Sequence, residues 1–121
     1  MPYWHYRGLG HGGLYWEVWN EPDAKYFYGG SQKQYLELYL ATVEAVRAAD
    51  PSAKVGGAAD ANYQPATAQI GPLLDYVKAH PATPFDFMSY HWYGGCTRDE
   101  KPPYDLEWAI EQAAASSKPA A

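Results

Sequence analysis

The sequence predicts an α/β fold in which parallel strands alternate with helices. Three segments share one order: a short apolar run, a Gly- or Pro-rich loop, and a segment with helical periodicity. Such alternation predicts βαβ units with right-handed crossovers. The chain has 121 residues, 47% of them hydrophobic, which suits one globular unit. Three such units fit either a small doubly wound sheet or part of a (β/α)8 barrel, and the pattern alone does not separate the two.

The first unit begins at residues 14–19, whose aromatic and β-branched side chains are typical of a strand. A helix is predicted after the following loop, because Ser31 and Gln34 have the spacing of a capping box. The residue before a proline avoids helical angles, so the helix should end at Asp50, before Pro51. Apolar side chains form a helical stripe between these limits: Tyr35, Leu38, Tyr39, Val43 and Val46.

The second unit has a predicted strand at residues 53–59 and a loop at residues 60–67. The helix that follows contains Pro72, which a helix tolerates only in its first turn. The third unit has a predicted strand at residues 85–91, a longer loop, and a last helix that Asp105 can cap. Apolar side chains mark one face of the second helix: Ile70, Leu73, Leu74 and Val77.

Composition excludes several classes of function. The formal net charge of −5 argues against a nucleic-acid partner, which needs a basic face. No run approaches the roughly 18 apolar residues of a membrane span, and residues 1–5 do not resemble a signal peptide. The only cysteine, Cys96, excludes an internal disulfide. The histidines and Cys96 lack the spacing of metal ligands, so we expect neither a metal nor another cofactor.

Polar side chains follow each predicted strand. Function in parallel α/β folds gathers in these loops, at the carboxyl ends of the strands. Glu21 should lie at such an end, partly desolvated among aromatic rings, and desolvation favours the protonated carboxyl that a general acid needs. Glycoside hydrolysis uses such an acid, and the Asn20 amide suits a sugar hydroxyl. The alternative is an ordinary strand-to-loop turn, in which Asn, Glu and Pro are common.

The stretch Tyr15-Trp16-Glu17-Val18-Trp19-Asn20-Glu21-Pro22-Asp23 resembles the fourth barrel strand of clan A glycoside hydrolases. Further segments resemble glycoside hydrolase family 39, which includes β-xylosidases and α-L-iduronidases. These are residues 27–30, the helix at residues 35–46, Lys54-Val55-Gly56-Gly57, and Phe85-Asp86-Phe87-Met88-Ser89-Tyr90-His91. The resemblance covers residues 15–121. It implies that Glu21 is the acid/base and that Asn20 binds the hydroxyl next to the reacting carbon.

The same resemblance implies the place of the chain in a barrel. The three strands become the fourth, fifth and sixth of eight, and residues 1–121 become a partial (β/α)8 catalytic domain truncated at both ends, since a whole barrel needs roughly 250 residues. Retaining glycosidases need a second carboxylate about 5–5.5 Å from the first. In this clan that nucleophile ends the seventh strand, so we expect it beyond Ala121 and expect the isolated chain to be inactive.

Other residues near the strand ends are weaker candidates. His91 can bond the sugar or the absent nucleophile, and Trp92 and Tyr93 can stack on the sugar, although a histidine packed at the rim is the alternative. Asp60 can line the sugar site, although turns favour aspartate for their own reasons. Glu17 should share a face with Glu21 if the strand is regular, which makes it a candidate second active-site carboxylate, but a buried Glu there more often pairs with a Lys or Arg.

Two functions remain open from the sequence. The first is a retaining glycosidase that acts on a carbohydrate, with a β-xyloside as the substrate that the resemblance offers. The second is a non-catalytic βα domain that binds carbohydrate or is structural. Coding sequence beyond Ala121 separates the two, because a β-rich stretch that ends in Glu restores the enzyme. Nothing in the residues selects the sugar, the linkage, the compartment or the oligomeric state.

Overall fold

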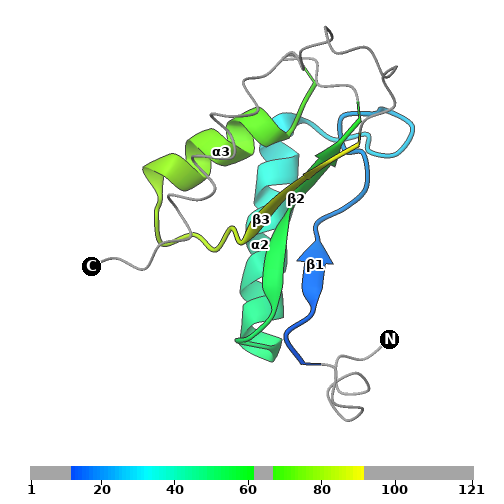
Figure 1. The fold of residues 1–121 in the computed structure, drawn as a ribbon. Helices are drawn as coiled ribbons and strands as arrows, with labels where there is room; N and C mark the ends of the chain where they lie inside the picture. The colour runs from blue at the N-terminus through cyan, green and yellow to red at the C-terminus, as the bar shows by residue number, and fades with distance from the viewer. Residues whose placement is uncertain (1–11, 62–66, 92–121) are drawn as a thin grey trace, which may run out of the picture.

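The computed structural model describes residues 12–61 and 67–91. Three strands alternate with two helices in this part of the chain (Figure 1). The elements are β1 (Tyr15–Glu17), α2 (Gln32–Ala49), β2 (Lys54–Asp60), α3 (Ile70–Ala79) and β3 (Phe87–Tyr90). The predicted order is therefore confirmed from β1 to β3, whereas the helix expected after Asp105 lies outside the described residues.

Helix α2 begins and ends where the sequence predicts. The Gln34 backbone N–H donates to the Ser31 hydroxyl at 3.2 Å, and the Ser31 N–H donates to the Gln34 side chain at 2.8 Å. This reciprocal pair satisfies two N–H groups that would otherwise lack partners at a helix start. The helix ends at Asp50, whose backbone is extended. Its buried stripe faces the core: Tyr35, Tyr39 and Val43.

Helix α3 also follows its predicted pattern. Pro72 lies in the first turn, where no intrahelical N–H bond is lost, and His80 ends the helix. No helix among the described residues is long and apolar enough to cross a lipid bilayer. The predicted apolar face is buried in full: Ile70, Leu73, Leu74 and Val77.

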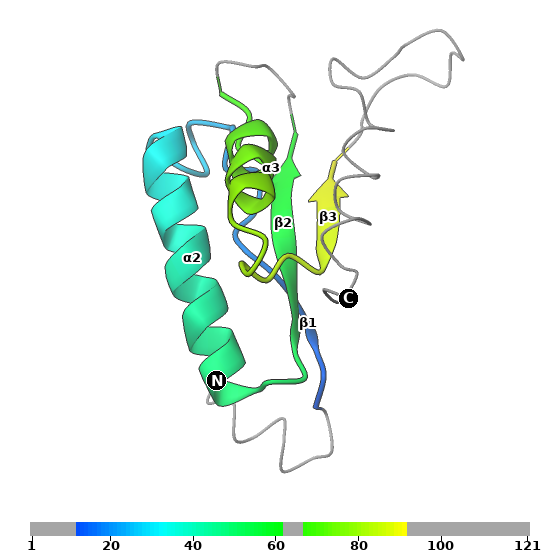
Figure 2. The ribbon, with the colours of Figure 1, turned by 90° about the vertical axis from the view of Figure 1, so that its left-hand side faces the viewer.

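The strands form one parallel sheet in the order β1-β2-β3. Both helices lie on the same face of this sheet (Figure 2), and their buried side chains form one core with Val55 and Ala58 of β2. Consecutive strand order with right-handed crossovers produces this one-sided cover. One βαβαβ half of a doubly wound sheet has the same one-sided cover, so the described elements fit part of a barrel without separating it from that alternative.

Candidate active site

The carboxyl ends of the three strands meet at one edge of the sheet, beside the loop that follows β1 (Figure 1). Hydrogen bonds to β2 continue past the end of β1, since Val18 N–H donates to the Gly56 carbonyl at 3.0 Å and Glu21 N–H donates to the Ala59 carbonyl at 3.2 Å. On the other side, His91 N–H donates to the Asp60 carbonyl at 2.9 Å. Strand β2 thus holds the backbones of Glu21 and His91, one on each side.

The chain between β1 and Glu21 is not a regular strand. Trp19 has φ of 70° and Glu21 has φ of 47°, both in the left-handed region that side chains with a Cβ rarely adopt. The strict alternation expected between Glu17 and Glu21 is therefore broken. The expectation of a buried Glu17 paired with a cation was also wrong: Glu17 is exposed and forms no ion pair within the described segments.

Glu21 and His91 form the central contact of the site. The Glu21 Oε1 and His91 Nδ1 atoms are 2.7 Å apart, and the Glu21 side chain is only 10% exposed. A short contact between a carboxyl and an imidazole suits both protonation states of the carboxyl. The imidazole N–H donates to Oε1 when Glu21 is ionised, and it still donates to Oε1 when Glu21 carries its proton on the other oxygen, Oε2. The contact therefore persists in both states that an acid/base needs.

His91 lies at the predicted strand end, but its partner differs from the expected one. The sequence suggested a bond to the sugar or to a second carboxylate, whereas the structure shows a bond to Glu21, 70 residues earlier. Its role as a sugar ligand stays a prediction. The carboxyl ends of a parallel sheet bring such distant residues together, here across β2, but spacing in the sequence does not show which side chains will touch.

Asp60 is the last residue of β2, not the first residue of the predicted loop. Its side chain is fully buried, and Oδ2 accepts the N–H groups of Gln69 and Ile70, each at 2.8 Å. Oδ1 has no hydrogen-bond partner among the residues that the structure describes. These contacts cap the start of α3, because Gln69 itself makes no side-chain cap. Contact of Asp60 with a sugar stays a prediction, and its enclosure argues against it.

Burial, together with the nearby negative charge of Asp23, raises the pKa of Asp60 to about 6, against the lowering effect of the two backbone N–H bonds. Removing a carboxylate from water disfavours its ionised form, which explains the direction. The unpartnered Oδ1 can carry the added proton while Oδ2 continues to accept from α3. Asp23 is also buried, and its own Oδ1 accepts the Ala61 N–H at 2.9 Å, which ties the loop after Glu21 to the end of β2.

We expect Asp60→Asn to change how stability depends on pH. Between about pH 4 and 6 the folded protein holds a proton on Asp60 that the unfolded chain has released, so this group makes the free energy of unfolding fall as pH rises across that window. Asn does not titrate. Urea unfolding from pH 4 to 7 should therefore show the variant gaining up to about 3 kcal/mol relative to the wild type. Equal slopes for the two proteins would contradict the prediction.

Of the remaining predicted site residues, only Asn20 lies in the part of the chain that the structure describes. Asn20 is exposed next to Glu21, which leaves its amide open to solvent and to a ligand. Trp92 and Tyr93 lie outside the described residues. In residues 12–61 and 67–91, no group of three His, Cys, Asp or Glu side chains could hold a metal ion.

The loop after β1 also carries aromatic rings that the sequence left without an assignment. The Trp19 indole N–H donates to the Phe27 carbonyl at 3.1 Å, and the Trp19 ring lies 5.7 Å from the Tyr28 ring. Tyr26 is 82% exposed and its ring lies 4.4 Å from that of Phe27. The Trp19 side chain, which follows a residue-19 backbone of positive φ, is thus bonded within its own loop.

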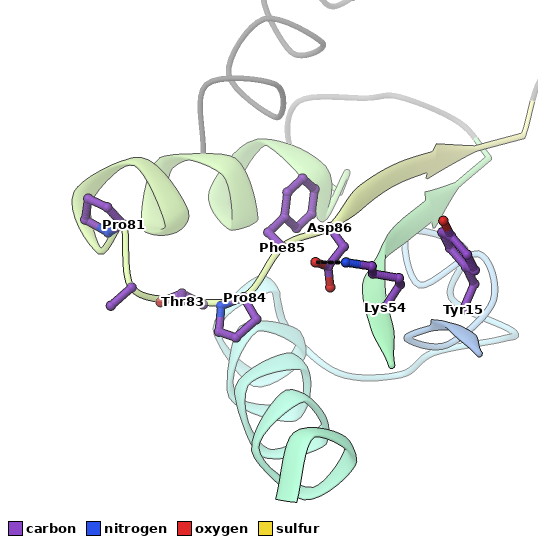
Figure 3. Close-up of a pocket in the computed structure, with 8 residues that line it drawn as sticks. Tyr15, Lys54, Pro81, Thr83, Pro84, Phe85 and Asp86 are labelled. Atoms are coloured by element: carbon purple, nitrogen blue, oxygen red, sulfur yellow. Dashed lines mark ion pairs between the residues drawn. The ribbon is translucent and has the colours of Figure 1, made fainter. Parts of the chain in front are cut away.

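A pocket lies at the opposite, amino-terminal end of the strands (Figure 3). Asp86 is its ionic centre: it accepts from Arg47 at 2.6 Å and from the Val55 N–H at 2.8 Å, and it lies 3.8 Å from the Lys54 ammonium. In α/β barrels this end serves stability, whereas chemistry occurs at the carboxyl ends. The contacts of Asp86 with Arg47, Val55 and Lys54 therefore indicate a stabilising role, separate from the Glu21–His91 site at the other end of the strands.

Fold and site together define a class: a parallel α/β protein that holds a buried carboxyl–imidazole pair at the carboxyl ends of its strands. The family model for glycosyl hydrolases family 39 matches residues 12–119. The chain belongs to this family, as the sequence resemblance predicted.

Individual relatives agree with this membership. A β-xylosidase of Caldicellulosiruptor saccharolyticus is 33% identical over 109 residues, which cover 86% of this chain and 20% of the relative. The solved family 39 β-xylosidase from Caulobacter crescentus has a TM-score of 0.68 and 33% identity, with 95% of this chain and 25% of that enzyme covered. A solved glucosidase from Croceicoccus marinus has a TM-score of 0.59 and 35% identity, with 84% of this chain and 21% of that enzyme covered. The chain thus spans about a fifth to a quarter of these proteins.

Proposed function

We propose that the chain contributes the acid/base half of the active site of a retaining glycosidase. The observation that carries the proposal is the buried Glu21 carboxyl, bonded to His91 at 2.7 Å at the carboxyl ends of parallel strands. Glu21 protonates the glycosidic oxygen as the bond breaks, and later removes a proton from the attacking water. His91 holds the carboxyl in position through both steps, since their contact suits either protonation state.

Asn20 is proposed to bind the sugar hydroxyl next to the reacting carbon. Its exposed position directly before Glu21 supports this role, because an amide offers both a donor and an acceptor. Trp92 and Tyr93 are proposed to contact the sugar, since they directly follow His91 in the sequence. The full burial of the Asp60 side chain against the start of α3 argues against a sugar contact and favours a role in holding this end of β2.

The nucleophile is proposed to come from outside the described residues. Double displacement needs a second carboxyl about 5–5.5 Å from Glu21. Strands β1, β2 and β3 are proposed as the fourth, fifth and sixth strands of a (β/α)8 barrel, and the seventh then supplies that carboxylate. The one-sided cover of the sheet by α2 and α3 fits this placement, and the match to family 39 supports it.

A β-xyloside is the proposed substrate. Similar proteins from Caldicellulosiruptor saccharolyticus, Geobacillus stearothermophilus and Caulobacter crescentus are described as β-xylosidases. The similar protein from Croceicoccus marinus is described as a glucosidase, so glucosides are the necessary comparison.

The experiment is an assay of the whole gene product on aryl β-xylosides, with aryl β-glucosides as the comparison. Proton NMR during early turnover identifies the anomer of the sugar released. A retaining mechanism should release β-xylose first, with the α-anomer appearing only by slow mutarotation. Initial release of the α-anomer would contradict retention. Absence of turnover on any aryl glycoside would contradict the assignment as a glycosidase.

A further inference from the structure

Asp60 connects three elements at the site, although it does not belong to the Glu21–His91 pair. Its side chain is fully buried and holds the first two N–H groups of α3, from Gln69 and Ile70. Gln69 extends this connection, since its side-chain amide donates to the Pro22 carbonyl at 3.3 Å, in the loop that follows Glu21. A carboxylate in this place fixes the end of β2 against the start of α3.

The backbone at the same position holds the Glu21–His91 pair. Register between β2 and β3 shifts between Ala58 and Asp60, and Ala59 between them has φ of 59°. Such an irregularity changes the direction in which the neighbouring backbone groups and side chains point. The Ala59 carbonyl accepts the Glu21 N–H, and the next carbonyl, of Asp60, accepts the His91 N–H. The separation of Glu21 and His91 therefore depends on the conformation of these two residues.

The geometry points to Asp60 as a positioning residue: by bonding the start of α3, its carboxylate holds the Ala59–Asp60 backbone in the conformation that sets the Glu21–His91 contact. This inference rests on the proposed function, because it concerns delivery of the proton by Glu21. This role needs no contact between Asp60 and the sugar. Its effect should reach the reaction through the position of Glu21, and the acid step gives the clearest measurement of that position.

Leaving groups separate this role from simple stabilisation. Departure of a good leaving group, such as 2,4-dinitrophenolate, needs little help from an acid, whereas departure of phenolate needs a proton placed well. A variant that only reduces the folded fraction lowers kcat/KM for both substrates by the same factor. A variant that misplaces Glu21 lowers kcat/KM for the phenyl glycoside more. The ratio of the two values is independent of the amount of active protein.

The experiment compares Asp60→Ala, Asp60→Asn and Asp86→Ala in the whole gene product, on phenyl and dinitrophenyl glycosides of the sugar that it cleaves. Asp60→Ala should lower the phenyl-to-dinitrophenyl ratio about 10-fold, as expected for a small misplacement of a catalytic group. Asp60→Asn keeps an oxygen that accepts from α3 and should restore the ratio to within about 2-fold. Asp86→Ala removes a comparable set of bonds at the far end of β2 and should leave the ratio unchanged.

If Asp60→Ala gives no folded protein, Asp60→Ser is used for the same test. The serine side chain is shorter than that of aspartate and is not expected to reach both N–H groups of Gln69 and Ile70. An unchanged ratio in the Ala or Ser variant would overturn the inference, as would an equal fall in Asp86→Ala. Glu21→Gln is measured alongside. If it lowers the ratio and the Asp60 variants do not, only the positioning role fails. If it does not lower the ratio, the proposed function fails.

Discussion

Replacing Glu21 with Gln in the whole gene product should lower kcat/KM for phenyl β-xyloside by about 10²- to 10⁴-fold, the usual contribution of a positioned general acid. The amide keeps the size of the side chain and a hydrogen bond to His91, but it has no proton to give to a leaving oxygen. Activated dinitrophenyl substrates should keep most of their kcat/KM. Their kcat should fall, because the second step still needs a general base to activate water.

Added azide gives a second measurement of the Glu21→Gln variant, which tests the loss of the general base in the second step. An anionic nucleophile needs no general base, so azide should raise kcat of Glu21→Gln on the dinitrophenyl substrate and form a glycosyl azide with retained configuration. Glu17→Gln is the matched control, since Glu17 is an exposed carboxylate four residues earlier in the same segment. A leaving-group effect in Glu17→Gln that is missing from Glu21→Gln would move the acid role to Glu17.

Much of the fold follows from local chemistry in the sequence. The capping box at Ser31 and the proline after Asp50 mark the limits of α2, because each acts on the backbone within one helical turn. Strand ends were less predictable. Strand β1 ends at Glu17 although apolar residues continue to Trp19, because the positive φ of Trp19 turns the chain out of the strand. No residue type there indicates such a conformation, since it depends on the contacts of the loop.

The general position of the site could be predicted from the sequence, but its contacts could not. Parallel strands place their carboxyl ends together, so the sequence indicated that Glu21 and His91 would share one edge. It did not indicate that they would bond each other. Nor did it indicate the burial of Asp60, which was expected on an exposed loop and instead ends β2 against α3. That position depends on the shift in register at Ala59, a backbone feature that an alanine does not reveal in a sequence.

Gly56→Ala should cause a large loss of stability, about 3 kcal/mol, at the upper end for overpacking a core. Gly56 lies in the central strand, paired with Phe87 of β3. A Cβ there would overlap the Phe87 carbonyl oxygen and lie 2.8 Å from the Phe87 ring. That ring also contacts the Tyr15 ring of β1, at a centroid distance of 5.6 Å. A backbone oxygen cannot rotate away, so β3 must move.

Gly29→Ala is the matched control, because a Cβ at Gly29 would meet no atom within 4 Å. Urea unfolding of the two variants of the whole gene product should show a lower midpoint for Gly56→Ala and a change within about 0.5 kcal/mol for Gly29→Ala. Movement of β3 also moves His91, whose N–H is bonded to the end of β2. The folded fraction of Gly56→Ala should therefore show the reduced phenyl-to-dinitrophenyl ratio expected of a misplaced Glu21. Unchanged stability would mean that β2 and β3 are not packed as closely as the structure shows.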